Sequence, residues 1–333
     1  MVNILILRIV HKAILVTPTP CANRLVQERT MRYGRFRFQF VGNLLCSLIQ
    51  LYQLTVLFCI LSTANHQGHT MGFNTIELNV DEGVATLTLN RPKALNSFTM
   101  EMHGEVREAM AQVIDDASIR CLVLTGAGRG FCAGQDLGDR AVSADEGAPD
   151  LGDSVEKNYN PLIRSIMNLP KPVICAVNGV AAGAGSSIAL ACDIVIAARS
   201  ASFIQVFCKI GLIPDSGGTW NLPRAVGLAR AKGLAMLGDR LPAETAREWG
   251  LIWECVDDDI LQDEAQKMAR YFATQPTYAL GQIKKLLNES GTNTLFEQTE
   301  LEKDAMKELG QSDNYREGVA AFMEKRPPVF KGA

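Results

Sequence analysis

Three uninterrupted apolar runs, separated by helical patterns, constrain the fold of this chain more than any other feature. They cover residues 121–125, 173–177 and 194–197, and none of them contains a charged residue. A strand that is apolar along its whole length is buried on both faces, which is typical of a sheet covered by helices on each side. Because helical segments lie between these runs, we predict an α/β fold with layers of strands and helices.

An alternating pattern precedes these runs. Residues 75–80 and 84–89 alternate apolar and polar side chains around Asp81-Glu82-Gly83, which predicts a β-hairpin. Thr99 then opens a segment with acidic residues near its start and apolar residues at helical spacing. We therefore predict a helix whose apolar positions are Met102, Val106, Met110, Val113 and Ile114.

From about residue 261 the pattern is helical only. The periodicity predicts helices over residues 261–274, 276–288, 295–309 and 314–323. An all-helical end of this kind forms a separate layer or an oligomerisation element. We accordingly expect a core over residues 71–260 and a helical C-terminal oligomerisation region over residues 261–333.

Residues 1–70 differ from the rest of the chain. They hold seven Lys and Arg against one acid, Glu28, and residues 41–61 carry no charge. A long uncharged stretch after basic residues resembles a membrane segment with its positive flank inside. The other interpretation is that translation begins at Met71 and that the preceding residues are an upstream read-through. Both stay open, and function is considered from Met71 onward.

Charge, histidine and cysteine usage exclude several classes of function. From residue 71 onward the chain has 26 basic and 35 acidic residues, a net charge of −9, which is unsuited to nucleic acid. Only His103 follows Met71, so a His-rich metal site is excluded and a Ser-His-Asp hydrolase would rest on His103 alone. Nine cysteines without a C-x-x-C pair indicate buried reduced thiols and a cytoplasmic protein, among them Cys121, Cys175 and Cys192.

Two glycine-rich turns follow predicted strands. Residues 126–131 end in Phe131 where a dinucleotide fingerprint needs Gly or Ala, and residues 183–188 fail the same test. What remains are turns at residues 133–136 and 183–185. Such turns expose backbone N–H groups that suit a developing oxyanion. They equally permit tight turns and close helix packing, and spacing alone leaves both interpretations open.

Four motifs resemble, in order, those of the crotonase (enoyl-CoA hydratase/isomerase) superfamily. They are Asn-Arg-Pro-x-Ala-Leu-Asn at 90–96, Gly-Phe-Cys-Ala-Gly-Gln-Asp-Leu at 130–137, Lys-Pro-Val-Ile-Cys-Ala-Val-Asn-Gly at 171–179 and Gly-Leu-Ile-Pro-Asp-Ser-Gly-Gly at 211–218. The resemblance covers residues 71–333. It implies a spiral of ββα units with an all-helical C-terminal part, a homotrimer or dimer of trimers, and an acyl-CoA substrate. No metal or separate cofactor is implied, since CoA is part of the substrate.

The resemblance also implies roles for individual residues. The N–H groups of Gln135 and Ala184 would hold the thioester oxygen, and Asp215 would be the acid/base of an isomerase. At the two positions where hydratases of the family carry glutamates, this chain has Ser187 and Phe207. Burial beside Phe207 or Trp220 would raise the pKa of Asp215. Asp215 also precedes a predicted helix, so it could instead be an N-cap, or Ser216 could cap while Asp215 faces the site.

CoA binding is expected of residues around the first two motifs. Cationic side chains would neutralise phosphates and backbone groups would meet the adenine, although an ordinary solvated charge is the alternative for each cation. Asp136 and Arg129 could equally hold their loop together. The expected CoA-binding residues are Arg91, Lys93, Ala94, Leu95, Ala133, Gly134, Asp136, Leu137 and Lys325.

Within the family, the motifs most resemble the ring-epoxide isomerases of phenylacetate breakdown. That resemblance implies conversion of 2-(1,2-epoxy-1,2-dihydrophenyl)acetyl-CoA to oxepin-CoA, with a double-bond shift carried out by one carboxylate. Two alternatives stay open. One is another crotonase reaction such as enoyl-CoA hydration, and the other is a catalytically silent acyl-CoA-binding protein in which Asp215 is only a cap.

Overall fold

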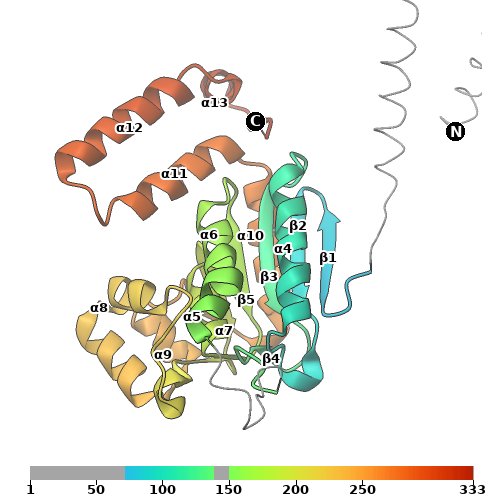
Figure 1. Ribbon diagram of the computed structural model, residues 1–333. Coiled ribbons are helices and arrows are strands. Elements are labelled where there is room, and N and C mark those ends of the chain that lie inside the picture. Colours follow the sequence, from blue (N-terminus) through green and yellow to red (C-terminus); the bar gives the residue numbers. More distant parts are fainter. Residues whose placement is uncertain (1–71, 139–149, 333) are drawn as a thin grey trace, which may run out of the picture. The chain divides into compact units, whose positions relative to one another are not determined.

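The computed structural model describes residues 72–138 and 150–332 (Figure 1). Both interpretations of residues 1–70, including the uncharged stretch at 41–61, lie outside these residues. In the part of the chain that is described, no helix has the length and apolar character needed to cross a membrane.

Six strands form the larger sheet, in the order β1-β2-β3-β5-β7-β10. Every neighbouring pair is parallel except the β1-β2 hairpin, whose two turn residues Glu82 and Gly83 both have positive φ (46° and 80°). Such a turn matches the natural twist of a two-residue hairpin. The strands are β1 (Ile76–Asp81), β2 (Val84–Leu89), β3 (Cys121–Gly126), β5 (Val173–Val177), β7 (Ile194–Ala198) and β10 (Glu254–Val256).

The three apolar runs are the central strands of this sheet. Every residue of β3 and β5 is buried, as the predicted two-sided covering requires. In Figure 1, α4 (Met100–Asp115) and α6 (Asn160–Asn168) lie in front of the sheet and α10 (Leu261–Ala273) lies behind it. The predicted hairpin and α/β architecture are confirmed.

A smaller sheet has the order β4-β6-β8-β9. Its strands are β4 (Gly130–Cys132), β6 (Val180–Ala182), β8 (Ser202–Ile204) and β9 (Arg240–Pro242). The first three each follow a strand of the larger sheet directly, so that β3-β4, β5-β6 and β7-β8 are successive turns of one spiral. This is the ββα spiral that the family resemblance implied.

Helix starts and stops follow local sequence signals. Thr99 caps α4 by accepting a hydrogen bond from the N–H of Met102 (3.2 Å), as expected. The remaining short helices of this part are η1 (Pro92–Ala94), α5 (Leu151–Ser154), the π-helical turn η2 (Val155–Tyr159), α7 (Ala184–Leu190), η3 (Val206–Ile210), α9 (Ala243–Glu248) and η4 (Asp258–Ile260). The long helix α8 (Gly218–Leu237) is interrupted at Gly227.

Four helices end the chain, close to the predicted ranges. The first, α10, buries alanines 265, 269 and 273 against the sheet, because small side chains at every fourth position allow close approach. The others are α11 (Thr277–Glu289), α12 (Leu295–Leu309) and α13 (Asp313–Glu324). Their role in oligomerisation remains a prediction.

Candidate active site

Two glycine turns from different layers of the spiral meet. Gly134 follows β4 and has φ +89°; a Cβ on this residue would lie 3.0 Å from the carbonyl oxygen of Ala182 and 3.3 Å from the nitrogen of Ala184. A Cβ on Gly185 would lie 2.3 Å from the carbonyl oxygen of Cys132. Only glycine fits such approaches, so these glycines do permit close packing, and the packing itself brings the two backbones together.

Two N–H groups of these turns, those of Gln135 and Ala184, have no acceptor among the described residues. Gln135 forms a parallel bridge with Phe98 in which Phe98 N–H donates to the oxygen of Gly134 (2.8 Å) and Asp136 N–H donates to the oxygen of Phe98 (2.9 Å). This pattern points the N–H of Gln135 away from Phe98. Within residues 72–138 and 150–332, neither Gln135 N–H nor Ala184 N–H has a hydrogen-bond partner. Both can therefore donate to a ligand.

The side chain of Gln135 is held by hydrogen bonds at both ends of its amide. Its Nε2 donates to the oxygen of Phe98 (2.9 Å), and its Oε1 accepts from the hydroxyl of Tyr159 (2.9 Å). Tyr159 is 1% exposed and Phe98 is fully buried. The sequence analysis did not find Tyr159, because it ends a π-helical turn with no motif or periodicity that marks it.

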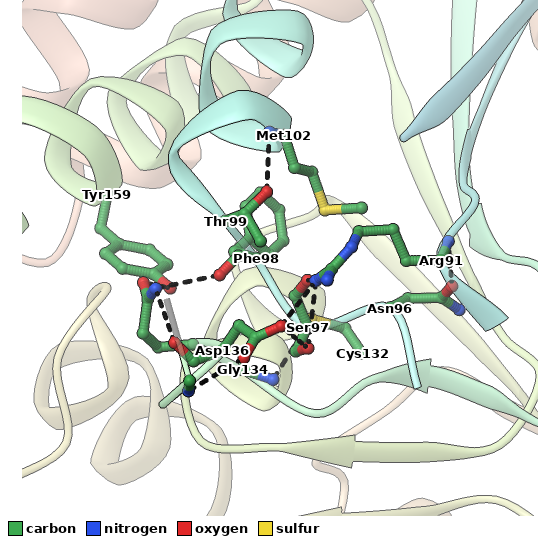
Figure 2. Close-up of polar contacts among 12 residues, drawn as sticks. Arg91, Asn96, Ser97, Phe98, Thr99, Met102, Cys132, Gly134, Asp136 and Tyr159 are labelled. Atoms are coloured by element: carbon green, nitrogen blue, oxygen red, sulfur yellow. Dashed lines mark hydrogen bonds and ion pairs between the residues drawn. The ribbon is translucent and has the colours of Figure 1, made fainter. Parts of the chain in front are cut away.

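Asp136, which follows Gln135 in the turn, is held by an ion pair with Arg91. Arg91 Nη1 lies 3.0 Å from Asp136 Oδ2 and donates to the carbonyl oxygen of Ser97 (2.5 Å), as Figure 2 shows. The two side chains are about equally exposed, at 25% and 24%. Asp136 thus contributes to holding the loop, its contact with CoA stays a prediction, and the charge of Arg91 is shared with that carboxylate.

Most of the expected CoA-binding residues gather around this turn. Lys93 and Ala94 belong to η1, and Leu95 accepts a hydrogen bond from Ala133 N–H (2.9 Å), which joins η1 to the end of β4. Lys93 is exposed, and Leu137 is 60% exposed. Lys325 is the exception.

Lys325 is the C-cap of α13, which lies well away from β4 in Figure 1. The structure therefore brings together Arg91, Lys93, Ala94, Leu95, Ala133, Gly134, Asp136 and Leu137 and leaves Lys325 apart. A second residue that the sequence analysis missed is Asn96, whose buried amide donates to the oxygens of Ala127, Gly130 and Phe131 (2.8 to 3.1 Å). Asn96 ends the first motif, at residues 90–96, but the motif by itself did not indicate this role.

Asp215 lies in a tight turn before α8 and is partly buried. Ser216 and Gly217 have positive φ (52° and 77°), and the Ser216 hydroxyl donates to Asp215 Oδ1 (3.0 Å). The N-cap of α8 is Gly217, with no side-chain cap. The main-chain oxygen of Asp215 accepts a hydrogen bond from Gly218 N–H (2.8 Å) at the start of the helix. The N-cap position therefore belongs to Gly217, and the expectation that Asp215 or Ser216 occupies it is wrong.

The two positions where hydratases carry glutamates adjoin these turns. Ser187 is fully buried in α7, and its Oγ lies 2.8 Å from where a Cβ on Gly218 would be. Phe207 is 6% exposed, and its ring lies 3.9 Å from where a Cβ on Gly183 would be. Helix α7, which begins at Ala184, thus packs against helix α8, which follows Asp215. Trp220 stacks under the guanidinium of Arg224, 3.9 Å from the ring centre.

The thiol nearest the first turn is inert. Complete burial raises the pKa of Cys132 to about 12, although a hydrogen bond from Gly134 N–H acts in the opposite direction. Cys132 therefore stays protonated at neutral pH and packs as an apolar side chain. Among the residues that the structure describes, no group of three His, Cys, Asp or Glu side chains could hold a metal ion.

Comparison with known proteins agrees with the spiral and its turns. The family described as "Enoyl-CoA hydratase/isomerase" matches residues 79–333. The chain belongs to this family. The predicted resemblance and fold are confirmed, and the chain is an enzyme of the crotonase superfamily.

Members of the enoyl-CoA hydratase/isomerase family resemble the chain over nearly their whole length. The "1,2-epoxyphenylacetyl-CoA isomerase" of Escherichia coli K12 is 62% identical over 254 residues, which are 76% of this chain and 97% of that protein. The "Probable enoyl-CoA hydratase" of Rhodobacter capsulatus is 46% identical over 79% of this chain and all of its own length. The crystal structure of an enoyl-CoA hydratase/isomerase from Cupriavidus metallidurans CH34, 32% identical, superposes with a TM-score of 0.73 and covers 79% of this chain and 98% of its own.

Proposed function

We propose that this enzyme isomerises acyl-CoA thioesters, with 2-(1,2-epoxy-1,2-dihydrophenyl)acetyl-CoA as substrate and oxepin-CoA as product, in phenylacetate catabolism. The observation that carries the proposal is the 62% identity to the Escherichia coli 1,2-epoxyphenylacetyl-CoA isomerase, extending over 97% of that protein. The four motifs are contained in the matching region. The same chemistry also shifts an isolated double bond of an enoyl-CoA into conjugation with its thioester.

In this proposal the N–H groups of Gln135 and Ala184 donate to the thioester oxygen. The proton next to a thioester carbonyl is only weakly acidic, so its removal needs stabilisation of the enolate that forms. A preorganised donor at such a site contributes about 3 to 4 kcal/mol. Two observations support this role: neither N–H group has an acceptor among the residues that the structure describes, and Gly134 closely approaches Ala184.

Asp215 is proposed to carry the proton. Its carboxylate takes a proton from the carbon next to the thioester carbonyl, and the carbon–hydrogen electron pair moves into the enolate. The same carboxylic acid then returns the proton to a carbon farther along the chain, and the electron pair of the enolate forms the conjugated double bond. Substrate and product are isomers, and no other reactant is consumed. General acid–base catalysis of this kind contributes about 10² to 10⁴-fold.

Hydration is the less supported alternative. Neither Ser187 nor Phe207 offers a carboxylate to activate water, and both are buried beside the two turns. A silent binding protein is less supported because Gly217, and not Asp215, occupies the N-cap position of α8. CoA enters as part of the substrate, so no separate cofactor is proposed, and the assembly is proposed to be a homotrimer or dimer of trimers.

The test compares the wild-type protein with the Asp215→Asn variant on a 3-enoyl-CoA and on the epoxide thioester. Conjugation is followed by ultraviolet absorbance and oxepin-CoA by chromatography. We expect wild-type turnover and a fall in kcat of at least about 10²-fold in the variant, with an unchanged melting temperature. The matched control is Asp263→Asn, an exposed carboxylate on α10, which should leave kcat unchanged. Full activity in Asp215→Asn removes Asp215 as the base, and an inactive wild-type protein removes the isomerase.

A further inference from the structure

Tyr159 lies directly behind the turn that carries the Gln135 N–H. Its hydroxyl is 2.9 Å from Gln135 Oε1, and its side chain is 1% exposed. A side chain buried to that degree cannot touch a substrate. Any effect of its hydroxyl on the reaction must therefore pass through Gln135 or another protein group.

The direction of this hydrogen bond is fixed by its neighbour. The oxygen of Phe98 only accepts, so the end of the Gln135 amide that faces it must be the NH₂ group. The carbonyl end of the amide then faces Tyr159, and the tyrosine hydroxyl is the donor. The Gln135 amide thus links the Phe98 main chain to η2, with both of its ends hydrogen-bonded.

Backbone hydrogen bonds between Phe98 and residues 134–136 orient the Gln135 N–H. The oxygen of Phe98 accepts from both Asp136 N–H (2.9 Å) and Gln135 Nε2 (2.9 Å), while Phe98 N–H donates to the oxygen of Gly134. The peptide group that joins Gly134 to Gln135 contains both the Gly134 oxygen and the Gln135 N–H. Rotating that peptide would break the Phe98 bond and turn the N–H away from its target.

Gly134 gives this peptide little intrinsic stiffness. Its φ of +89° is open to glycine alone among common residues, and glycine also tolerates many other backbone angles. A donor that stabilises a transition state has to be held to within about 0.5 Å and 10–20°. Rigidity must therefore come from the contacts around the turn.

Aromatic packing holds the side chain of Tyr159 in a fixed position. Its ring packs edge-on against His103, with centroids 4.5 Å apart, and lies 6.0 Å from the ring of Phe98. It ends the π-helical turn η2, a rare conformation that often occurs at functional positions. On the other side of the turn, the Arg91–Asp136 ion pair holds the next residue.

From these contacts we infer that Tyr159 is a positioning residue for the isomerase, holding the Gln135 amide so that the Gln135 N–H stays aimed at the thioester oxygen. This inference rests on the proposed function. A hydrogen bond that acts only on alignment should influence kcat far more than thioester binding.

The test begins with Tyr159→Phe, which removes one oxygen and keeps the ring packing. We expect kcat for the 3-enoyl-CoA to fall roughly tenfold, as the loss of one aligned hydrogen bond allows, and KM to stay within about twofold. Tyr271→Phe is the matched control, because this tyrosine is 61% exposed on α10; it should leave both constants unchanged.

A double-mutant cycle tests the route through Gln135. Gln135→Met keeps the length of the side chain and the main-chain N–H but removes the amide. If Tyr159 acts through that amide, adding Tyr159→Phe to Gln135→Met should cause no further loss of kcat. An equal loss in both backgrounds would mean that Tyr159 acts elsewhere and would overturn the inference.

A spectroscopic measurement separates alignment from a general loss of structure. Infrared difference spectra of bound phenylacetyl-CoA, labelled with ¹³C at the thioester carbonyl, report the hydrogen bonding of that oxygen. We expect a shift to lower frequency in the wild-type protein and partial loss of the shift in Tyr159→Phe. An unchanged band in the variant, whatever its kcat, overturns the inference. Failure of the wild-type protein to bind and shift the thioester instead overturns the proposed function, and the inference with it.

Discussion

The main-chain nitrogen of Ala184 lies 3.3 Å from the point at which a side chain on Gly134 would begin. These residues are 50 positions apart in the chain, at the ends of the neighbouring strands β4 and β6. Their contact brings together the N–H groups of Gln135 and Ala184, neither of which has an acceptor in the described part of the chain. The catalytic proposal depends on it.

Gly134→Ala should therefore abolish most of the isomerase activity. The new methyl group would meet the oxygen of Ala182 at 3.0 Å, and alanine is strained at φ +89°. Displacing one oxyanion donor corresponds to a fall in kcat of about 10² to 10³-fold, measured by the conjugation assay. Gly104→Ala, in an exposed part of α4 with no atom within 4 Å of the new Cβ, is the control and should keep full activity. Wild-type activity in Gly134→Ala would show that the turns need not touch.

The Arg91–Asp136 pair should behave as one unit. Because the two side chains fix the same turn, removing either one removes the ion pair between them. We expect Arg91→Gln and Asp136→Asn each to lower kcat roughly tenfold, and the double variant to be no worse than the poorer single variant. Kinetics of the four proteins check this. Additive losses would mean that Arg91 and Asp136 act independently, as they would if Arg91 chiefly binds a CoA phosphate.

Lys284 should anchor the C-terminal helices. Its ammonium, 8% exposed as a side chain, donates to Asp193 Oδ2 (2.9 Å) and to the oxygen of Ile166 (2.7 Å), which ties α11 to the sheet and to α6. Lys284→Met removes the cationic partner of Asp193. That largely buried carboxylate keeps only the hydrogen bond from Val173 N–H (2.7 Å) within the described residues, and such a change typically costs about 3 to 5 kcal/mol. We expect the melting temperature to fall by roughly 6 to 12 °C. Calorimetry of Lys285→Met, the exposed neighbouring lysine, should show almost no change.

Glu105 should give the fold a defined acid sensitivity. Burial alone would raise its pKa, but hydrogen bonds from the Thr75 hydroxyl and from the N–H groups of Asn74, Thr75 and Ile76 hold the pKa below its ordinary value. A lowered pKa means that the carboxylate stabilises the folded state above pH 4.5, and that this stabilisation is lost as the pH falls through the folded-state pKa.

We therefore expect Glu105→Gln to lower the melting temperature by roughly 2 to 6 °C at pH 7 and by much less near pH 3. Scanning calorimetry at both pH values measures the difference. Glu108→Gln, an exposed position on the same helix, is the control. An equal effect of Glu105→Gln at both pH values would mean that the carboxylate charge is not what holds β1 to α4.

Local sequence signals determined most of the larger sheet and the helices. The strands over residues 84–89 and 173–177 were predicted with their observed ends. An alternating run buries its apolar side chains on one face of a strand, and a short continuous apolar run buries them on both faces. The smaller sheet was not predicted. Its strands have three residues each, too short for any periodicity, and their pairing is decided by neighbours that lie about 20 to 50 residues away in the chain.

The turn at Asp215 illustrates a limit of local reasoning. Asp215 and Ser216 are typical capping residues, yet the chain passes through two positive φ angles, at Ser216 and Gly217, and Gly217 is the N-cap of α8. Local preference is worth about 1 kcal/mol, which tertiary packing of the helix readily outweighs.

The sequence by itself determined the family, the central strands, the C-terminal helices and the types of residue at the site. Only the tertiary structure decided that Gly134 meets Ala184, that Asp136 pairs with Arg91, and that the Tyr159 hydroxyl reaches Gln135. The physical reason is that secondary structure follows from periodicities over a few neighbouring residues, whereas an N–H group is aimed by contacts between segments that are far apart in the chain.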